Sequence, residues 1–185
     1  YNAHKGFSVG NRAWKLPEMR TALNAIAPDL CLLQEVQGKL KKRKEKKLTE
    51  PETPQIEFLA SHSWRQHVYG KNATYGLAHH GNGILSQYNI LTWENINISF
   101  SRRASRSLLH AVIEIDSAPI HVICVHLGLF KIERVRQLNL LNQRINAHVP
   151  TDAPLIIAGD FNDWHKKASQ VLQQELNLRE VYQSF

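Results

Sequence analysis

The sequence predicts an α/β protein in which packed β-sheets are flanked by helices. Short and almost wholly apolar runs indicate buried strands, whereas longer segments repeat apolar residues at helical spacing. Several hairpin-like strands also follow one another between the helical segments. This mixed order favours packed sheets with helices outside over a simple doubly wound sheet. The chain has 185 residues, of which 43% are hydrophobic and 21% charged, so we expect one globular domain over residues 1–185.

The first half of the chain predicts a helix, a strand and a second helix. Pro17 suits the first turn of a helix over residues 16–27, where apolar residues recur at helical spacing. These apolar residues are Leu16, Met19, Leu23 and Ile26. Residues 29–36 form a short apolar run that ends in polar residues, which is typical of a strand buried on both faces. Residues 55–62 are expected to form a short helix.

The second half predicts mostly strands, followed by helix, strand and helix. Turn residues separate most of five strand candidates, at 64–70, 81–87, 90–99, 107–115 and 119–128. A helix is predicted next, because apolar residues line one face: Ile132, Val135, Leu138, Leu141 and Ile145. Residues 154–160 are expected to form another buried strand, and residues 168–175 a final helix.

The net charge of +7 is concentrated in one segment, because seven of the nine residues Lys39–Lys47 are basic. Residues 38–54 are therefore predicted to form a basic surface loop. A solvated loop is the ordinary interpretation, and an anionic partner, nucleic acid or a membrane surface, is the alternative. No apolar run approaches the ~20 residues that cross a bilayer, and no cationic and apolar leader is visible. We expect a cytoplasmic protein, and nothing in the pattern indicates an obligate oligomer.

The two cysteines, Cys31 and Cys124, both lie among aliphatic residues. A free thiol in such surroundings behaves as a small buried hydrophobe. A disulfide between them is the alternative, and two cysteines do not make a zinc site.

Polar side chains stand at the ends of several predicted strands. Glu35 ends one strand, His126 ends another, and Asp160 and Asn162 follow a third, while Asn2 has a comparable place near the chain start. Ligands bind at strand ends in layered α/β proteins, so these groups are expected to converge on one cleft. Carboxylate and amide oxygens suit Mg²⁺, and an Asp can orient or deprotonate an attacking water. The set therefore predicts metal-assisted phosphoryl chemistry.

Each of these residues also has an ordinary structural interpretation. Glu35 alone would be a surface acid at a strand end, and His126 alone would be a hydrogen-bonded core histidine. The run "GDFND" at 159–163 would be an Asx turn. The joint pattern favours function, because three separate strands end in the same chemical groups.

Five segments in order, "NAHKG", "LQEV", "GNGILSQY", "VHLG" and "GDFND", resemble the endonuclease/exonuclease/phosphatase superfamily. The resemblance is strongest to its compact bacterial branch and spans nearly the whole chain. It implies a four-layered α/β sandwich, with two mixed sheets packed face to face and helices outside. It also implies a hydrolase that uses Mg²⁺, with Mn²⁺ as a substitute, to cleave phosphate esters.

The resemblance also assigns roles to positions of this sequence. Glu35 matches a Mg²⁺ ligand, and Asn2 matches an asparagine close to the metal and the scissile phosphate. Asp160 matches the residue that orients the nucleophilic water, Asn162 the amide that holds the phosphate, and His126 a histidine of the nuclease and sphingomyelinase branches. Three positions match substrate-facing residues more loosely: Arg106, Asn82 and His80.

The sequence departs from the family pattern at its C-terminal end. The family carries a "Ser-Asp-His" motif and an upstream strand with another Asp, and neither occurs before Phe185. The first motif also begins only one residue into the sequence. The resemblance therefore implies a chain truncated at both ends, without the full catalytic set.

Two functions from different classes follow. The leading hypothesis is a Mg²⁺-dependent phosphoesterase of the nuclease, phosphodiesterase and phosphatase class, which acts on nucleic acid or a phospholipid head group. A phosphodiester is favoured over a monoester because His126 is present. The alternative is a non-catalytic module with a degenerate site that binds an anionic partner, either nucleic acid or a membrane surface.

Overall fold

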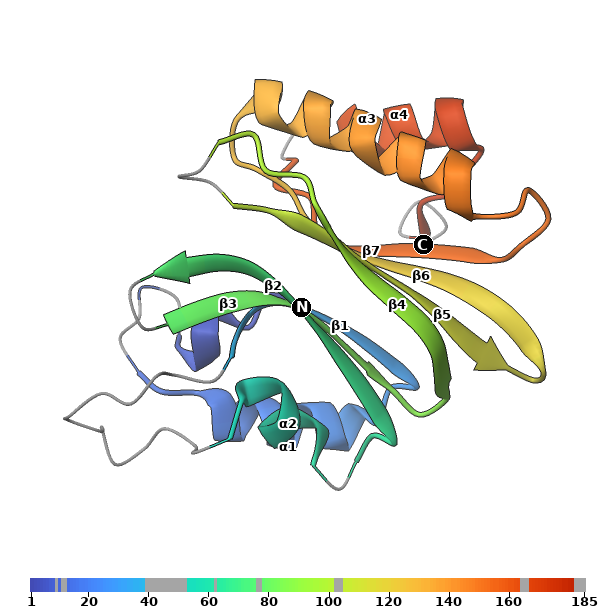
Figure 1. Cartoon of the computed structure of the whole chain (residues 1–185). Helices are drawn as coiled ribbons and strands as arrows, with labels where there is room; N and C mark the ends of the chain where they lie inside the picture. Colours follow the sequence, from blue (N-terminus) through green and yellow to red (C-terminus); the bar gives the residue numbers. More distant parts are fainter. Residues whose placement is uncertain are drawn as a thin grey trace.

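The computed structural model describes most of the chain, namely residues 1–8, 10, 13–38, 53–61, 63–75, 78–101, 105–163 and 167–181. Within these residues the protein has four layers (Figure 1), with two helices, two sheets and two further helices stacked in that order. The four-layered α/β sandwich that the resemblance implied is therefore confirmed. The predicted loop over residues 38–54 lies almost wholly outside the described residues.

The helices are found close to their predicted positions. They comprise a short 3-10 helix η1 (His4–Gly6) and the α-helices α1 (Leu16–Ile26), α2 (Gln55–Ala60), α3 (Lys131–His148) and α4 (Lys167–Leu176). The strands are β1 (Leu30–Gln37), β2 (Gln66–Tyr75), β3 (Ala78–Ser86), β4 (Asn89–Asn97), β5 (Ser107–Ile115), β6 (Ala118–His126) and β7 (Leu155–Asp160). Each predicted helix and strand is confirmed, with boundaries that differ by a few residues.

The two sheets differ in strand direction. The first has the order β1-β3-β2 with antiparallel pairs, and a parallel bridge between Asn2 and Gln34 adds the chain start to it. The second has the order β4-β5-β6-β7, in which only β6 and β7 run parallel. Parallel neighbours end at the same edge of a sheet, so the last residues of β6 and β7 lie side by side.

The core follows from the alternation of side chains along the strands. Leu109, Ala111 and Ile113 of β5 are buried against the other sheet, whereas Leu108 packs toward α3 together with Leu141. Both cysteines are buried and free, so the disulfide alternative is excluded.

The first turns of α3 differ from the prediction. Ile132 and Val135 are 68% and 51% exposed, because Glu133 and Gln137 take the inward positions of these turns. Gln137 is needed there, since its Oε1 accepts the backbone N–H of Gly128 at 2.8 Å. An apolar side chain would leave that buried N–H without an acceptor.

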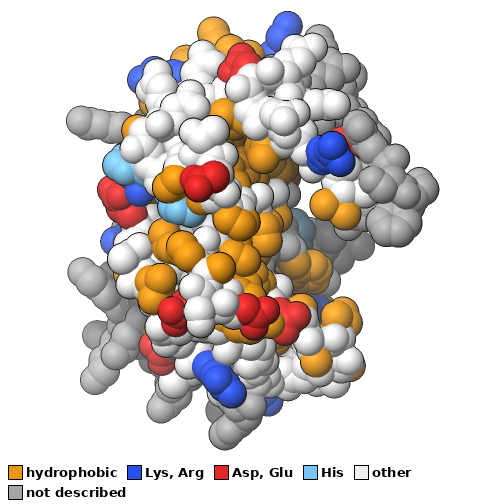
Figure 2. Space-filling model, turned by 90° about the vertical axis from the view of Figure 1, so that its right-hand side faces the viewer, with side chains coloured by type: hydrophobic (Ala, Val, Ile, Leu, Met, Phe, Trp, Pro, Cys, Tyr) orange, Lys and Arg blue, Asp and Glu red, His pale blue; other side chains and the backbone are white. Residues whose placement is uncertain are grey.

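Two other apolar positions are less buried than predicted. Ile26, in the last turn of α1, is exposed. The strand over residues 154–160 was predicted to be buried, but no residue of β7 is buried and Ile156 is 42% exposed, because β7 is the edge strand of its sheet among the described residues. Figure 2 shows the end of the sheets where β6 and β7 begin, and hydrophobic side chains gather down the middle of that face.

Among the described residues, no helix combines the length and hydropathy that a membrane-spanning segment needs.

Candidate active site

The candidate site lies where β1, β6 and β7 end. In the parallel register of β6 and β7, His126 stands opposite Asp160. The bridge between Asn2 and Gln34 brings the chain start to the same place, beside the end of β1. The topology therefore brings together side chains that lie far apart in the sequence.

Glycine is required just before the end of β7. Gly159 has φ +149°, and a Cβ there would lie 2.0 Å from the carbonyl oxygen of Val125 on β6. Two backbones this close leave no room for a side chain. The close approach fixes Asp160 directly beside the last residue of β6.

Asp160 forms an Asx turn with Asn162. Its Oδ1 accepts the backbone N–H of Asn162 at 3.0 Å, and Asn162 has a left-handed φ of +48°, which asparagine tolerates well. The structural interpretation of this motif is therefore correct. The turn also has a consequence for function, because it holds the Asp160 carboxylate in one orientation.

The second oxygen of Asp160 faces two other candidate residues. Its Oδ2 accepts a hydrogen bond from Nδ2 of Asn2 at 3.3 Å and lies 3.8 Å from Nε2 of His126. The Asp160 side chain is 30% exposed. It can therefore contact water or a substrate while its neighbours fix its position.

A single carbonyl joins two more candidates to this group. The carbonyl of Leu127 accepts hydrogen bonds from Nδ2 of Asn162 at 2.9 Å and from Nε of Arg106 at 3.2 Å. The N–H of Leu127 in turn donates to the carbonyl of Asp160 at 2.8 Å. The residue after β6 thus links the Arg106 guanidinium to the Asp160 turn.

Glu35 is turned toward the site by irregular backbone. It has φ +53° and lies where the pairing of β1 with β3 shifts register between Leu33 and Val36. Its Oε2 forms an ion pair with Nζ of Lys5 at 3.2 Å. Lys5 was not predicted, although a cation three residues after Asn2 in "NAHKG" is the signal that could have found it.

The electrostatic environment of Glu35 favours its charged form. Partial burial acts to raise its pKa, but Lys5, with smaller contributions from His126 and His80, lowers the pKa overall. The carboxylate is therefore charged and faces the ammonium group of Lys5.

The two histidines of the site are held neutral. Burial and then Arg106 lower the pKa of His126 to about 4, against the opposing effect of Asp160. Burial and then Lys5 lower the pKa of His80 to about 4, against the opposing effect of Glu35. Both imidazoles are thus within electrostatic reach of the carboxylates.

Asn82 occupies a different environment. It is fully buried on β3, where its Nδ2 donates to the carbonyl oxygens of Ser107 at 2.9 Å and Cys124 at 3.4 Å. These bonds connect the two sheets behind the site. Arg102 and Arg103, two further arginines shortly before Arg106 in the sequence, lie outside the described residues.

The oxygen atoms of the site suit a hard cation. Within the described part of the chain, no group of three or more His, Cys, Asp or Glu side chains is arranged to hold a metal ion. Mg²⁺ commonly uses one or two carboxylates and completes its shell with water and substrate phosphate. The charged, partly exposed carboxylate of Glu35 fits that pattern, whereas a zinc site would need more ligands. The carboxamide oxygen of Asn2 accepts the backbone N–H of His4 at 3.0 Å and has a second lone pair with which to bind an ion.

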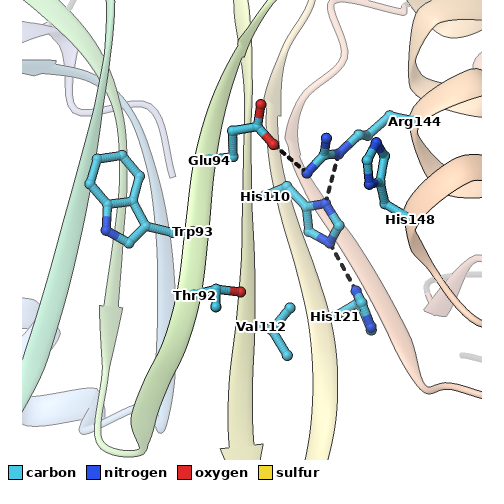
Figure 3. A pocket seen from close by; sticks show the side chains of 8 residues that line it. All are labelled: Thr92, Trp93, Glu94, His110, Val112, His121, Arg144 and His148. Atoms are coloured by element: carbon cyan, nitrogen blue, oxygen red, sulfur yellow. Dashed lines mark hydrogen bonds and ion pairs between the residues drawn. The ribbon is translucent and has the colours of Figure 1, made fainter.

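A polar pocket of about 220 Å³ lies away from the candidate site, on the outer face of the second sheet near the C-terminal end of α3 (Figure 3). Arg144 reaches from α3 to two strands. Its Nη2 pairs with Glu94 at 2.7 Å and its Nε donates to Nδ1 of His110 at 3.1 Å. The other ring nitrogen of His110 lies 3.0 Å from Nδ1 of His121. This pocket is separate from the candidate site, since His121 is near the start of β6 and His126 at its end.

Comparisons with known proteins identify relatives over almost the whole chain. Residues 1–176 match the sequence model of the Endonuclease/Exonuclease/phosphatase family. The chain is also 39% identical over 183 residues to the uncharacterized protein YbhP of Escherichia coli, a match that covers 98% of this chain and 72% of YbhP.

Two solved structures share the fold. An endonuclease/exonuclease/phosphatase from Beutenbergia cavernae superposes with a TM-score of 0.71 and 18% identity, over 87% of this chain and 46% of that one. TDP2 of D. rerio, in complex with a single-strand DNA product, gives a TM-score of 0.61 and 22% identity, over 84% of this chain and 56% of that one. The chain thus spans about half the length of these two solved chains.

Proposed function

Because the chain belongs to the endonuclease/exonuclease/phosphatase family, we propose that it is a Mg²⁺-dependent phosphoesterase that cleaves phosphodiesters by attack of water. Members of this family are in general metal-dependent enzymes that act on phosphate esters. The observation that carries the proposal is the convergence on Asp160, whose two oxygens are held by Asn162 and Asn2 beside His126.

Glu35 and Asn2 are the residues that would hold the divalent ion. Mn²⁺ would be accepted in its place, because the donors are oxygen atoms. Bound there, the ion would stabilise the negative charge that develops on the phosphoryl oxygens.

Asp160 would orient the attacking water and accept its proton. The carboxylate is held by donors on both of its oxygens and still contacts solvent. Such a positioned base needs no reorganisation during the reaction. Asn162 and Arg106 would bind the phosphate, since both are directed to the site by the carbonyl of Leu127.

The preference for a diester rests on His126. A neutral imidazole beside Asp160 can donate a hydrogen bond to a phosphoryl or leaving-group oxygen. A phosphomonoester carries more charge and depends more on cationic partners. Asn82 and His80 would lie behind the bound phosphate and support the residues that contact it.

Two substrate classes fit a phosphodiesterase site. The solved TDP2 complex contains single-strand DNA, which makes nucleic acid one candidate. A phospholipid head group is the other, because the large apolar residues Leu129, Phe130 and Ile132 are exposed just beyond Leu127. Comparing the hydrolysis of single-stranded DNA with that of phospholipid vesicles separates the two classes.

The test of the function itself is the hydrolysis of a bis-aryl phosphodiester. Wild type and Glu35→Ala are assayed with Mg²⁺ and with EDTA. We expect turnover only by wild type with Mg²⁺. Equal rates of hydrolysis under all four conditions would refute the proposed phosphoesterase activity. Binding of an anion would then remain as the function of the site.

A further inference from the structure

The backbone conformation that places Lys5 beside Glu35 is energetically unfavourable. His4, Lys5 and Glu35 have left-handed φ values of +44°, +57° and +53°, which non-glycine residues seldom adopt. Strained residues of this kind cluster at functional sites, where the surrounding structure fixes them. Here the strain lies on both sides of one ion pair.

The chain around Lys5 is fixed by its neighbours. The carbonyl of Lys5 accepts a hydrogen bond from Nε2 of Gln55 at 2.7 Å. The next residue, Gly6, has φ +83°, and a Cβ there would lie 2.8 Å from the ring of Trp14. The carbonyl of Gly6 also accepts the N–H of Lys15 at 2.7 Å. The backbone therefore directs Lys5 to the site while only its side chain remains free to move.

The ammonium group pairs with an oxygen of the carboxylate that would bind the metal ion. Nζ of Lys5 lies 3.2 Å from Oε2 of Glu35, and the Lys5 side chain is 40% exposed. An ion pair open to water is weak and exchanges easily. The Glu35 side chain is 20% exposed, so a solvated cation can reach it as well.

We propose that Lys5 is a built-in competitor of the divalent ion for Glu35, an inference that rests on the proposed function of the site. Metal binding displaces the Lys5 ammonium from the Glu35 carboxylate. The released cation remains at the site, because its backbone is fixed, and there it faces the anionic substrate. Lys5 thereby lowers the affinity of the empty site for metal and favours metal binding when a phosphate is present to receive the ammonium.

The test is the affinity for Mg²⁺, measured by isothermal titration calorimetry, with Mn²⁺ binding followed by electron paramagnetic resonance as a second readout. Lys5→Met removes the charge and keeps the length, so we expect metal binding about three- to tenfold tighter than in wild type. Lys5→Arg keeps the charge and should bind metal about as weakly as wild type. Lys15→Met is the matched control, because it removes a lysine from the exposed ion pair with Glu18, and it should bind as wild type does.

The outcomes separate this proposal from the function on which it rests. Unchanged or weaker metal binding by Lys5→Met, with Glu35→Ala still abolishing binding, would overturn the role of Lys5 alone. Absence of Mg²⁺ binding by wild type, or equal binding by Glu35→Ala, would overturn both the metal site and the competition. Circular dichroism of each variant verifies that it is folded. If Lys5→Arg bound metal as much as three- to tenfold tighter than wild type, the charge of Lys5 would not be the cause of the competition, and the proposal would be overturned.

Discussion

Acidification should destabilise the fold through His110, the buried histidine at the centre of the pocket between the second sheet and α3 (Figure 3). Arginine can only donate, so Nδ1 of His110 must accept from Arg144. The proton of neutral His110 is then on Nε2 and is donated to His121. This arrangement has no place for a second proton on His110.

The magnitude follows from the pKa of His110, which burial, then Arg144, His121 and His148, lower from 6.5 to about 4. The unfolded chain therefore takes up the proton first as the pH falls. The contribution of neutral His110 to the free energy of unfolding is fully present above pH about 6.5 and is lost as the pH falls toward about 4. Between pH 7.5 and pH 5 the full shift would cost about 2 kcal/mol, and screening by water in the open pocket reduces this to about 1 kcal/mol.

The assay is urea unfolding of wild type and His110→Gln at both pH values. Glutamine keeps one acceptor and one donor but takes up no proton. The wild type should lose about 1 kcal/mol more than the variant between pH 7.5 and pH 5. His67→Gln, at an exposed position of β2, is the control and should behave as wild type. Equal losses by wild type and His110→Gln would refute the reasoning.

Two further predictions concern the turn after β7. Gly159→Ala should lower the free energy of unfolding in urea by about 3 kcal/mol or more, because its Cβ would collide with the carbonyl of Val125. Ala158→Gly on the same strand is the control and should lower it by only about 1 kcal/mol. Equal losses by the two variants would contradict the close approach of β7 to β6. Asn162→Gly removes the amide but tolerates the left-handed backbone, so phosphodiester turnover should fall about 10- to 100-fold while stability changes by less than about 1 kcal/mol. Unchanged turnover would show that the amide does not act on the substrate.

The features that could be predicted from the sequence are those that depend on a local pattern of residues. Apolar runs and helical spacing located the strands and helices, and polar residues at strand ends predicted that His126 and Asp160 lie side by side. The parallel pairing of β6 with β7 is the physical reason, since it places His126 opposite Asp160.

What could not be predicted depends on contacts between distant segments. The pairing of Lys5 with Glu35 requires left-handed backbone at both residues, so the cation in "NAHKG" could have suggested Lys5 as a site residue but not Glu35 as its partner. The polar inward face of α3 exists because Gln137 serves a backbone N–H of the preceding turn. The pocket around His110 combines β4, β5, β6 and α3, and each of its residues alone has an ordinary sequence context.

The most direct measurement of the central claim compares wild type with Asp160→Asn in Mg²⁺-dependent hydrolysis of a bis-aryl phosphodiester. Asparagine keeps the size and can still accept the turn hydrogen bond, but it is not a base. We predict a fall in kcat of about 10²- to 10⁴-fold, while the free energy of unfolding falls by only about 1 kcal/mol through the lost hydrogen bond from Asn2. Turnover by Asp160→Asn at the wild-type rate would contradict the assignment of Asp160 and, with it, the proposed site.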